Sequence, residues 1–90
     1  MPRFYFHISN GHGFIEDEEG VELPDEQAAR SNAIEAARDV MAGDLREGLL
    51  DLGWFIEVED EAHRLLFTLT FAEAVTVNGG PGPARPWPSP

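Results

Sequence analysis

Cysteine and lysine are both absent from this chain of 90 residues. Without cysteine the chain can form neither a disulfide nor a thiolate metal site, and this absence fits a reducing compartment. No apolar run approaches the length of about 20 residues that a membrane-spanning helix needs. The N-terminus also lacks the pattern of a secretory signal. These absences predict a cytoplasmic protein with no membrane segment.

The charge is strongly one-sided. Six basic residues, all arginine, stand against 17 acidic residues, and the formal net charge is −11. Because such a chain repels phosphate groups, we expect no direct binding to nucleic acid. The same charge favours a basic protein partner through electrostatic steering. The simpler interpretation is that the acidic residues keep the protein soluble.

Proline and glycine are concentrated at the C-terminal end, where residues 78–90 contain five prolines and three glycines. A segment of this composition cannot form a packed core. We therefore predict a single folded domain over residues 1–77 and a disordered tail over residues 78–90. Within the tail, Pro83 and Pro86 have the P-x-x-P spacing of polyproline ligands, a spacing that any proline-rich segment produces easily.

The longest segment with helical periodicity is Pro24–Leu52. Asp25 is the predicted N-cap, because its carboxylate can accept hydrogen bonds from the first turn. Gly43 costs a helix roughly 1 kcal/mol relative to alanine, so it predicts a bend or a close contact. Gly48 or Gly53 is expected to end the helix. Apolar residues recur at spacings of three and four: Ala29, Ala33, Ala36, Ala37, Val40, Met41, Leu45 and Leu49.

Alternating apolar and polar residues predict strands on both sides of this helix. The expected strands are Arg3–Ser9, Phe14–Glu16, Val21–Leu23, Trp54–Glu59 and Arg64–Phe71, followed by a short helical turn at Ala72–Ala74. The predicted fold class is therefore α+β, in the order β-β-(β)-α-β-β. It consists of a small, mainly antiparallel sheet with the one long helix packed on one face.

The alternation also assigns side chains to the two faces of the sheet. The predicted buried layer, against the alanine stripe, is Phe4, Phe6, Ile8, Trp54, Ile56, Val58, Leu65, Phe67 and Leu69. The opposite face is predicted to carry Tyr5, His7, Phe55, Leu66, Thr68 and Thr70. That face is less polar than a solvated face needs to be, and such a patch often marks a contact surface. These six residues form the predicted partner-binding surface.

Residues capable of catalysis or metal binding form no recognised motif. The acidic run Glu16–Glu19 offers oxygen ligands for a cation, but it does not match the EF-hand loop, and a solvated turn is the favoured interpretation. The histidines, His7, His12 and His63, lack the spacing of a helix-borne metal pair. No serine lies in a nucleophile elbow. We therefore predict no catalytic residue, no metal ligand and no cofactor.

Two segments resemble a known family. The opening Met-Pro-Arg-Phe-Tyr-Phe-His and the run Asp17–Asp25 (DEEGVELPD) precede Ala29, Ala33 and Ala37. This arrangement resembles a family of short bacterial proteins classed only as a domain of unknown function. The resemblance covers residues 1–77 and implies no activity or catalytic residue.

The order of elements from Gly20 to Ala37 is also similar to that of HicB-type antitoxins, in which short strands and a turn precede an alanine-rich helix. That likeness implies a small basic RNA-cutting toxin as the partner. The leading hypothesis is thus a non-enzymatic interaction module that binds a basic protein or a second copy of itself. A module that binds a small molecule or a metal through Tyr5, His7 and the acidic turn is the second hypothesis. A small enzyme is the third.

Overall fold

The structure is a computed structural model that describes residues 1–78. Its elements, in order, are β1 (Arg3–Ser9), β2 (Phe14–Ile15), β3 (Val21–Glu22), α1 (Glu26–Arg46), β4 (Phe55–Glu59), β5 (Leu65–Thr70) and the 3₁₀ helix η1 (Phe71–Ala74). The predicted α+β class is confirmed. The tail predicted to be disordered spans residues 78–90, and all of it except Asn78 lies outside the described residues.

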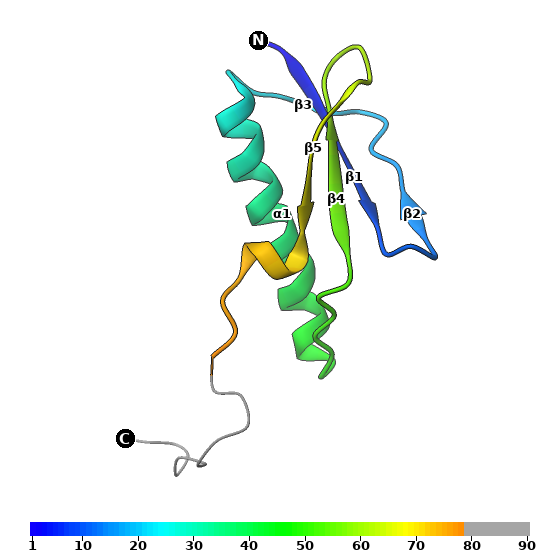
Figure 1. Cartoon of the computed structure of the whole chain (residues 1–90), viewed down its shortest axis with the longest axis vertical. Helices are drawn as coiled ribbons and strands as arrows, with labels where there is room; N and C mark the ends of the chain where they lie inside the picture. Colours follow the sequence, from blue (N-terminus) through cyan, green and yellow to red (C-terminus); the bar gives the residue numbers. More distant parts are fainter. Residues whose placement is uncertain (79–90) are drawn as a thin grey trace.

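All strand pairs in the sheet are antiparallel, and the strand order is β2-β1-β4-β5. The short strand β3 pairs with the start of β1, on the same edge as β2. The register places Phe6 opposite Val58 and Ile56 opposite Leu69. Because alternate residues share a face, these apolar residues all lie on one face of the sheet, where they form the core with the buried alanines of α1. Figure 1 shows α1 lying across one face of the sheet.

The two ends of α1 are fixed by local sequence. At the N-terminus, Asp25 Oδ1 accepts a hydrogen bond of 2.8 Å from the Ala28 N–H, so the predicted N-cap is confirmed. At the C-terminus, Gly48 has a left-handed φ of +80°. The N–H of Leu49 donates to the Asp44 carbonyl over 3.0 Å, which is the hydrogen bond of a Schellman motif. Of the two glycines predicted as possible ends of the helix, Gly48 is the one that ends it.

The core lies between the alanine stripe of α1 and the sheet. Because Ala29, Ala33 and Ala37 are fully buried and small, the helix approaches the strands closely. The chain after β5 then returns across α1 as η1, where Arg38 Nε donates to the Ala74 carbonyl over 2.8 Å. The buried apolar residues are Phe4, Phe6, Ala29, Ala33, Ala37, Met41, Ile56, Val58, Leu69, Phe71 and Ala74.

The prediction failed at the start of β5. Val58 pairs with Phe67, but Glu59 pairs with Leu65, so the register shifts and Leu66 is an extra residue on β5. A bulge of this kind reverses the alternation of side chains beyond it. Leu65, predicted to be buried, is 55% exposed, whereas Leu66 packs against the core instead of lying on the opposite face.

The helix is shorter than the segment with helical periodicity, because α1 ends at Arg46 whereas that segment extends to Leu52. Leu45 and Leu49 continue the apolar periodicity but are 55% and 54% exposed. Of the two possibilities predicted for Gly43, a bend or a close contact, the close contact is contradicted, because a Cβ built on this glycine would meet no atom within 4 Å. No helix within residues 1–78 is long and apolar enough to cross a membrane.

Candidate functional site

One face of the sheet has no helix over it within residues 1–78, and we call it the open face (Figure 1). Its side chains form three rows across the strands. The rows are Ser9, Phe55 and Thr70, then His7, Glu57 and Thr68, and finally Tyr5, Glu59 and Leu65. Aromatic rings and carboxylates therefore alternate over a short distance, within reach of one another as cross-strand neighbours.

His7 is the most buried polar residue of the open face, with 6% of its surface exposed. Its Nδ1 accepts a hydrogen bond of 3.0 Å from the backbone N–H of Asp17. Since Nδ1 is an acceptor, the proton of the neutral ring lies on Nε2, which donates to Glu59 Oε1 over 2.9 Å. The ring of Phe14 lies 5.5 Å away between centroids and helps to cover the imidazole.

This geometry assigns His7 a structural role. Both of its ring nitrogens already have protein partners, so a metal could bind only after one of these hydrogen bonds broke. The low exposure also keeps the imidazole from reaching a substrate in solvent. Within the described chain, no group of three or more potential ligand residues is arranged to hold a metal ion.

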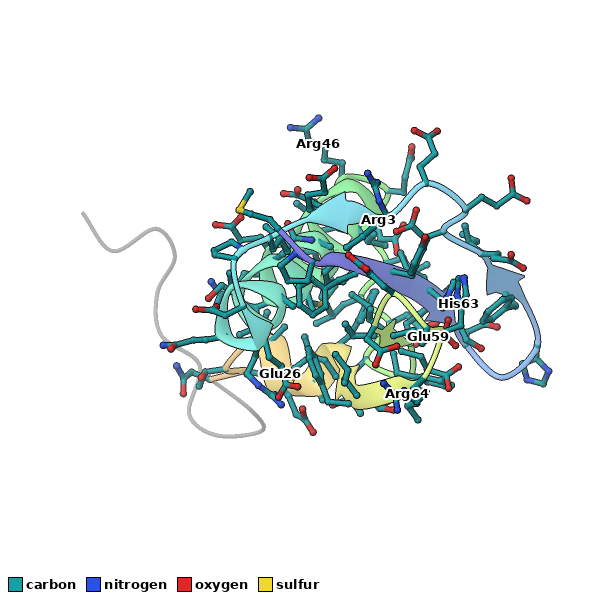
Figure 2. The ribbon with its side chains drawn as sticks, turned by 90° about the horizontal axis from the view of Figure 1, so that it is seen from above. Arg3, Glu26, Arg46, Glu59, His63 and Arg64 are labelled. Carbon is teal, nitrogen blue, oxygen red and sulfur yellow. The ribbon has the colours of Figure 1, made fainter. Side chains whose placement is uncertain are left out.

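The turn between β4 and β5 brings a second histidine to Glu59. His63 has a φ of +62°, which is uncommon for a residue other than glycine. In this conformation its Nδ1 lies 3.2 Å from Glu59 Oε1, and its ring lies 4.5 Å from that of Tyr5. Glu59 and His63 lie close together in Figure 2.

Glu59 is held in its ionised form by these neighbours. The hydrogen bond from His7 is the largest cause that lowers the pKa of Glu59 below its ordinary value, and the hydrogen bond from His63 acts in the same direction. Desolvation of the Glu59 carboxylate raises its pKa and so opposes both hydrogen bonds. The next residue, Asp60, also has a lowered pKa, chiefly because its carboxylate accepts the backbone N–H of Arg64. The open face thus carries fixed negative charge at one end.

The acidic turn before the helix is built around Asp17. One of its carboxylate oxygens accepts the Phe6 N–H over 3.1 Å, and the other accepts the Gly20 N–H over 3.0 Å. Phe6 lies between the residues of β1 that pair with β2 and with β3, so Asp17 completes this edge of the sheet. Both carboxylate oxygens of Asp17 already accept hydrogen bonds from the backbone. This supports the interpretation of the acidic run Glu16–Glu19 as a turn rather than a cation site.

Five of the six residues predicted for the partner-binding surface lie on the open face: Tyr5, His7, Phe55, Thr68 and Thr70. The sixth, Leu66, packs against the core because of the bulge. Glu57 and Glu59 belong to the same face, but the prediction omitted them because it selected for apolar and neutral side chains. Their alternation with Ile56 and Val58 was the signal that could have placed them there.

A second candidate site was not predicted at all. A cavity of about 430 Å³ lies between the C-terminal half of α1 and the segment after η1. Its lining is mainly apolar, with Met41, Leu45, Leu50 and Val75 among the residues and Arg38 as the charged one. This cavity depends on the return of the chain across α1, which no local pattern in the sequence indicates.

Most acidic residues have no basic partner within residues 1–78. Arg3 pairs with Glu22 over 2.8 Å, and Arg64 pairs with Asp60 over 3.3 Å. Other arginines are engaged elsewhere: Arg30 lies 4.2 Å from the centre of the Phe67 ring, and Arg38 is bound to a backbone carbonyl. In Figure 2, Arg46 projects away from the ribbon. The acidic excess is therefore not neutralised locally.

Comparison with known protein families identifies a match that covers most of the chain. Residues 3–72 match the model of a family described as a domain of unknown function, DUF6894. No curated protein and no solved structure matches the chain at a significant level. The match extends from the first residue of β1 into η1, so it includes the sheet, the helix and the open face. The predicted relationship to a family of unknown function is confirmed.

Proposed function

We propose a binding function for this chain, which belongs to the DUF6894 family of domains of unknown function. It is a non-enzymatic interaction module, and its open face binds a basic protein partner. The observation that carries this proposal is the composition of the face, where Phe55 and Tyr5 lie beside Glu57 and Glu59. Aromatic anchors with adjacent carboxylates suit a surface that presents arginine or lysine.

The charge of the whole chain supports the same kind of partner. A formal net charge of −11 accelerates the approach of a basic protein and slows that of an acidic one. The carboxylate of Glu59 stays ionised through its histidine partners, and it is fixed in position by them. A preorganised charge loses less freedom on binding than a mobile one.

A more specific form of this proposal is an antitoxin-like role, in which the partner is a small basic ribonuclease. Its support is the order of strands and helix, which is similar to that of HicB-type antitoxins, together with the acidic charge. A module for a small molecule or a metal receives less support, because the hydrogen bonds of His7 and Asp17 are already made within the fold.

The test compares matched charge reversals. Glu57→Lys places a positive charge on the open face, whereas Glu35→Lys makes the same change on the exposed surface of α1. Tagged wild-type protein and both variants are used to capture proteins from native cells at low salt, followed by mass spectrometry. We expect a basic protein retained by wild type and by Glu35→Lys, and lost with Glu57→Lys and with Phe55→Arg.

Two outcomes would count against the proposal. Equal loss with Glu57→Lys and Glu35→Lys would mean that net charge, and not the open face, governs the association. Retention of no basic protein by the wild type would remove the proposed partner class. Circular dichroism of each variant shows whether the fold is intact, because Glu57 and Phe55 lie within β4.

A further inference from the structure

The two edges of the sheet differ in how they are protected. The outer edge of β1 pairs with the two-residue strands β2 and β3, and Asp17 accepts the N–H between them. Short strands and acidic residues are common means of preventing a sheet edge from pairing with another chain. At the other edge, β5 is the last strand in the order, and within residues 1–78 no strand lies beyond it.

β5 has a bulge near its start, at Leu66, but it lacks the protection that charged residues and proline give to an edge strand. Its sequence, Leu-Leu-Phe-Thr-Leu-Thr, contains no charged residue and no proline over six residues. An uncharged edge strand of this length readily pairs with another strand. The absence of acidic residues matters in a chain with a net charge of −11, because two copies would repel each other least where β5 meets β5.

We propose that β5 pairs antiparallel with β5 of a second copy of this chain, forming a dimer with one continuous sheet. Pairing of a strand with itself about a two-fold axis requires no second surface, because each copy presents the same strand. This inference goes beyond the proposed function and does not depend on it. It would place two open faces side by side, so that a partner could contact both.

The backbone indicates which residues would make the new hydrogen bonds. The Phe71 N–H donates to the Trp54 carbonyl over 2.9 Å, in the same register as the pair of Leu69 and Ile56. The backbone N–H and carbonyl groups of successive residues point alternately to the two sides of a strand. Leu69 and Phe67 therefore direct their N–H and carbonyl groups toward β4. Thr68 therefore directs its N–H and carbonyl toward the free edge, and the two copies of Thr68 would pair at the centre of the interface.

The charges that flank β5 favour the antiparallel orientation. Arg64 precedes the strand, with 80% of its side chain exposed, and Glu73 follows it on η1. In an antiparallel pair centred on Thr68, Arg64 of one copy comes to the end of the partner strand, near Glu73. A parallel arrangement would instead place the two arginines together. Figure 2 shows Arg64 at the outside of the ribbon, where a second copy could reach it.

The first test removes the central hydrogen bonds. Proline is tolerated on an edge strand where its nitrogen faces outward, so Thr68→Pro should leave the ladder to β4 intact. Thr68→Val is the matched control, because it retains the backbone N–H and the β-branched shape. Sedimentation equilibrium of the full chain over a concentration series is expected to give twice the mass of one chain for wild type and Thr68→Val. Thr68→Pro is expected to give the mass of one chain.

The second test uses the flanking charges and does not depend on proline being tolerated. Arg64→Glu or Glu73→Arg alone is expected to weaken the dimer several-fold, and the double reversal is expected to restore it. A wild type that remains a single chain at every concentration would overturn the proposal. A dimer that persists in folded Thr68→Pro, or a double reversal no tighter than the single ones, would also overturn it. None of these results bears on capture of a basic protein by the open face.

Discussion

Gly20 is the residue that allows the chain to pass close to β1 just before β3 and the helix. It has a φ of +71°, and a Cβ built on it would lie 2.8 Å from Arg3 Cγ and 2.9 Å from the Phe4 carbonyl oxygen. Gly20→Ala therefore combines an unfavourable backbone conformation with a clash against β1. We expect it to lower the free energy of unfolding by about 2–4 kcal/mol, measured by urea denaturation.

Gly48 provides the matched control for this prediction. Its φ of +80° is similar, but a Cβ there would meet no atom within 4 Å. Gly48→Ala should cost only the strain of the left-handed backbone, about 1–2 kcal/mol. Equal losses for the two variants would show that the close contacts of Gly20 with β1 contribute nothing to stability.

Glu59 gives a second prediction at the scale of the residue, concerning pH. Its hydrogen bonds with His7 and His63 lower its pKa in the folded protein below the unfolded value of about 4.5. A carboxyl group with a lowered pKa stabilises the fold fully above its unfolded pKa, and this contribution is lost as the pH falls through the folded pKa. Glu59→Gln should therefore be less stable than wild type at neutral pH, and the difference should shrink below about pH 4.5.

Urea denaturation of both proteins at a series of pH values measures this difference. Asp60 has a lowered pKa of the same sign and is unchanged in both proteins, so its contribution cancels in the comparison. A difference between wild type and Glu59→Gln that stays constant from neutral to acid pH would show that the ionised form of Glu59 does not stabilise the fold.

At the scale of the element, α1 contains a position where a substitution should stabilise the fold. Gly43 lies within the helix, and a Cβ there would meet no atom within 4 Å. Gly43→Ala should raise the free energy of unfolding by about 1 kcal/mol, which corresponds to an increase in Tm of about 4–8 °C. The reverse change at the exposed neighbour, Ala42→Gly, should lower stability by a similar amount. An unchanged or lower Tm for Gly43→Ala would contradict the helical geometry at this position.

The elements also show what could be predicted from the sequence and what could not. Asp25 and Gly48 set the ends of α1 through contacts within a few residues, and the alternation in β1 gave its bounds directly. The bulge at Leu66 has no such local signal, because it depends on how β4 and β5 align. Since every side chain beyond a bulge changes face, this one residue moved Leu65 out of the predicted core and Leu66 into it.

The candidate site was less predictable than the fold for the same reason. His7 was correctly placed opposite the helix, but its burial depends on the backbone of Asp17 and on Glu59, which is 52 residues away. The contact of His63 with Tyr5 likewise requires His63, in the turn between β4 and β5, to adopt a left-handed backbone conformation. Alternation along a strand assigns a face to a side chain, and it does not identify its neighbours on that face.

At the scale of the whole molecule, the excess of acidic residues controls stability as well as binding. Within residues 1–78, Glu22 and Asp60 pair with arginines, and Glu59 is hydrogen-bonded to two histidines. The remaining carboxylates repel one another across the surface and destabilise the compact state. Added salt reduces this repulsion, because the screening length falls to about 10 Å at 0.1 M ionic strength.

We therefore expect sodium chloride to raise the Tm at neutral pH, by about 4–8 °C for each 1 kcal/mol of repulsion that is screened. Differential scanning calorimetry measures this effect, at a fixed protein concentration because the Tm of an associating protein also depends on that concentration. The same salt series near the isoelectric point of about 4.4 is the control, since the net charge there is close to zero. A Tm that is flat or falls with salt at neutral pH would mean that the acidic residues are paired locally, and the argument for a basic partner would lose its electrostatic basis.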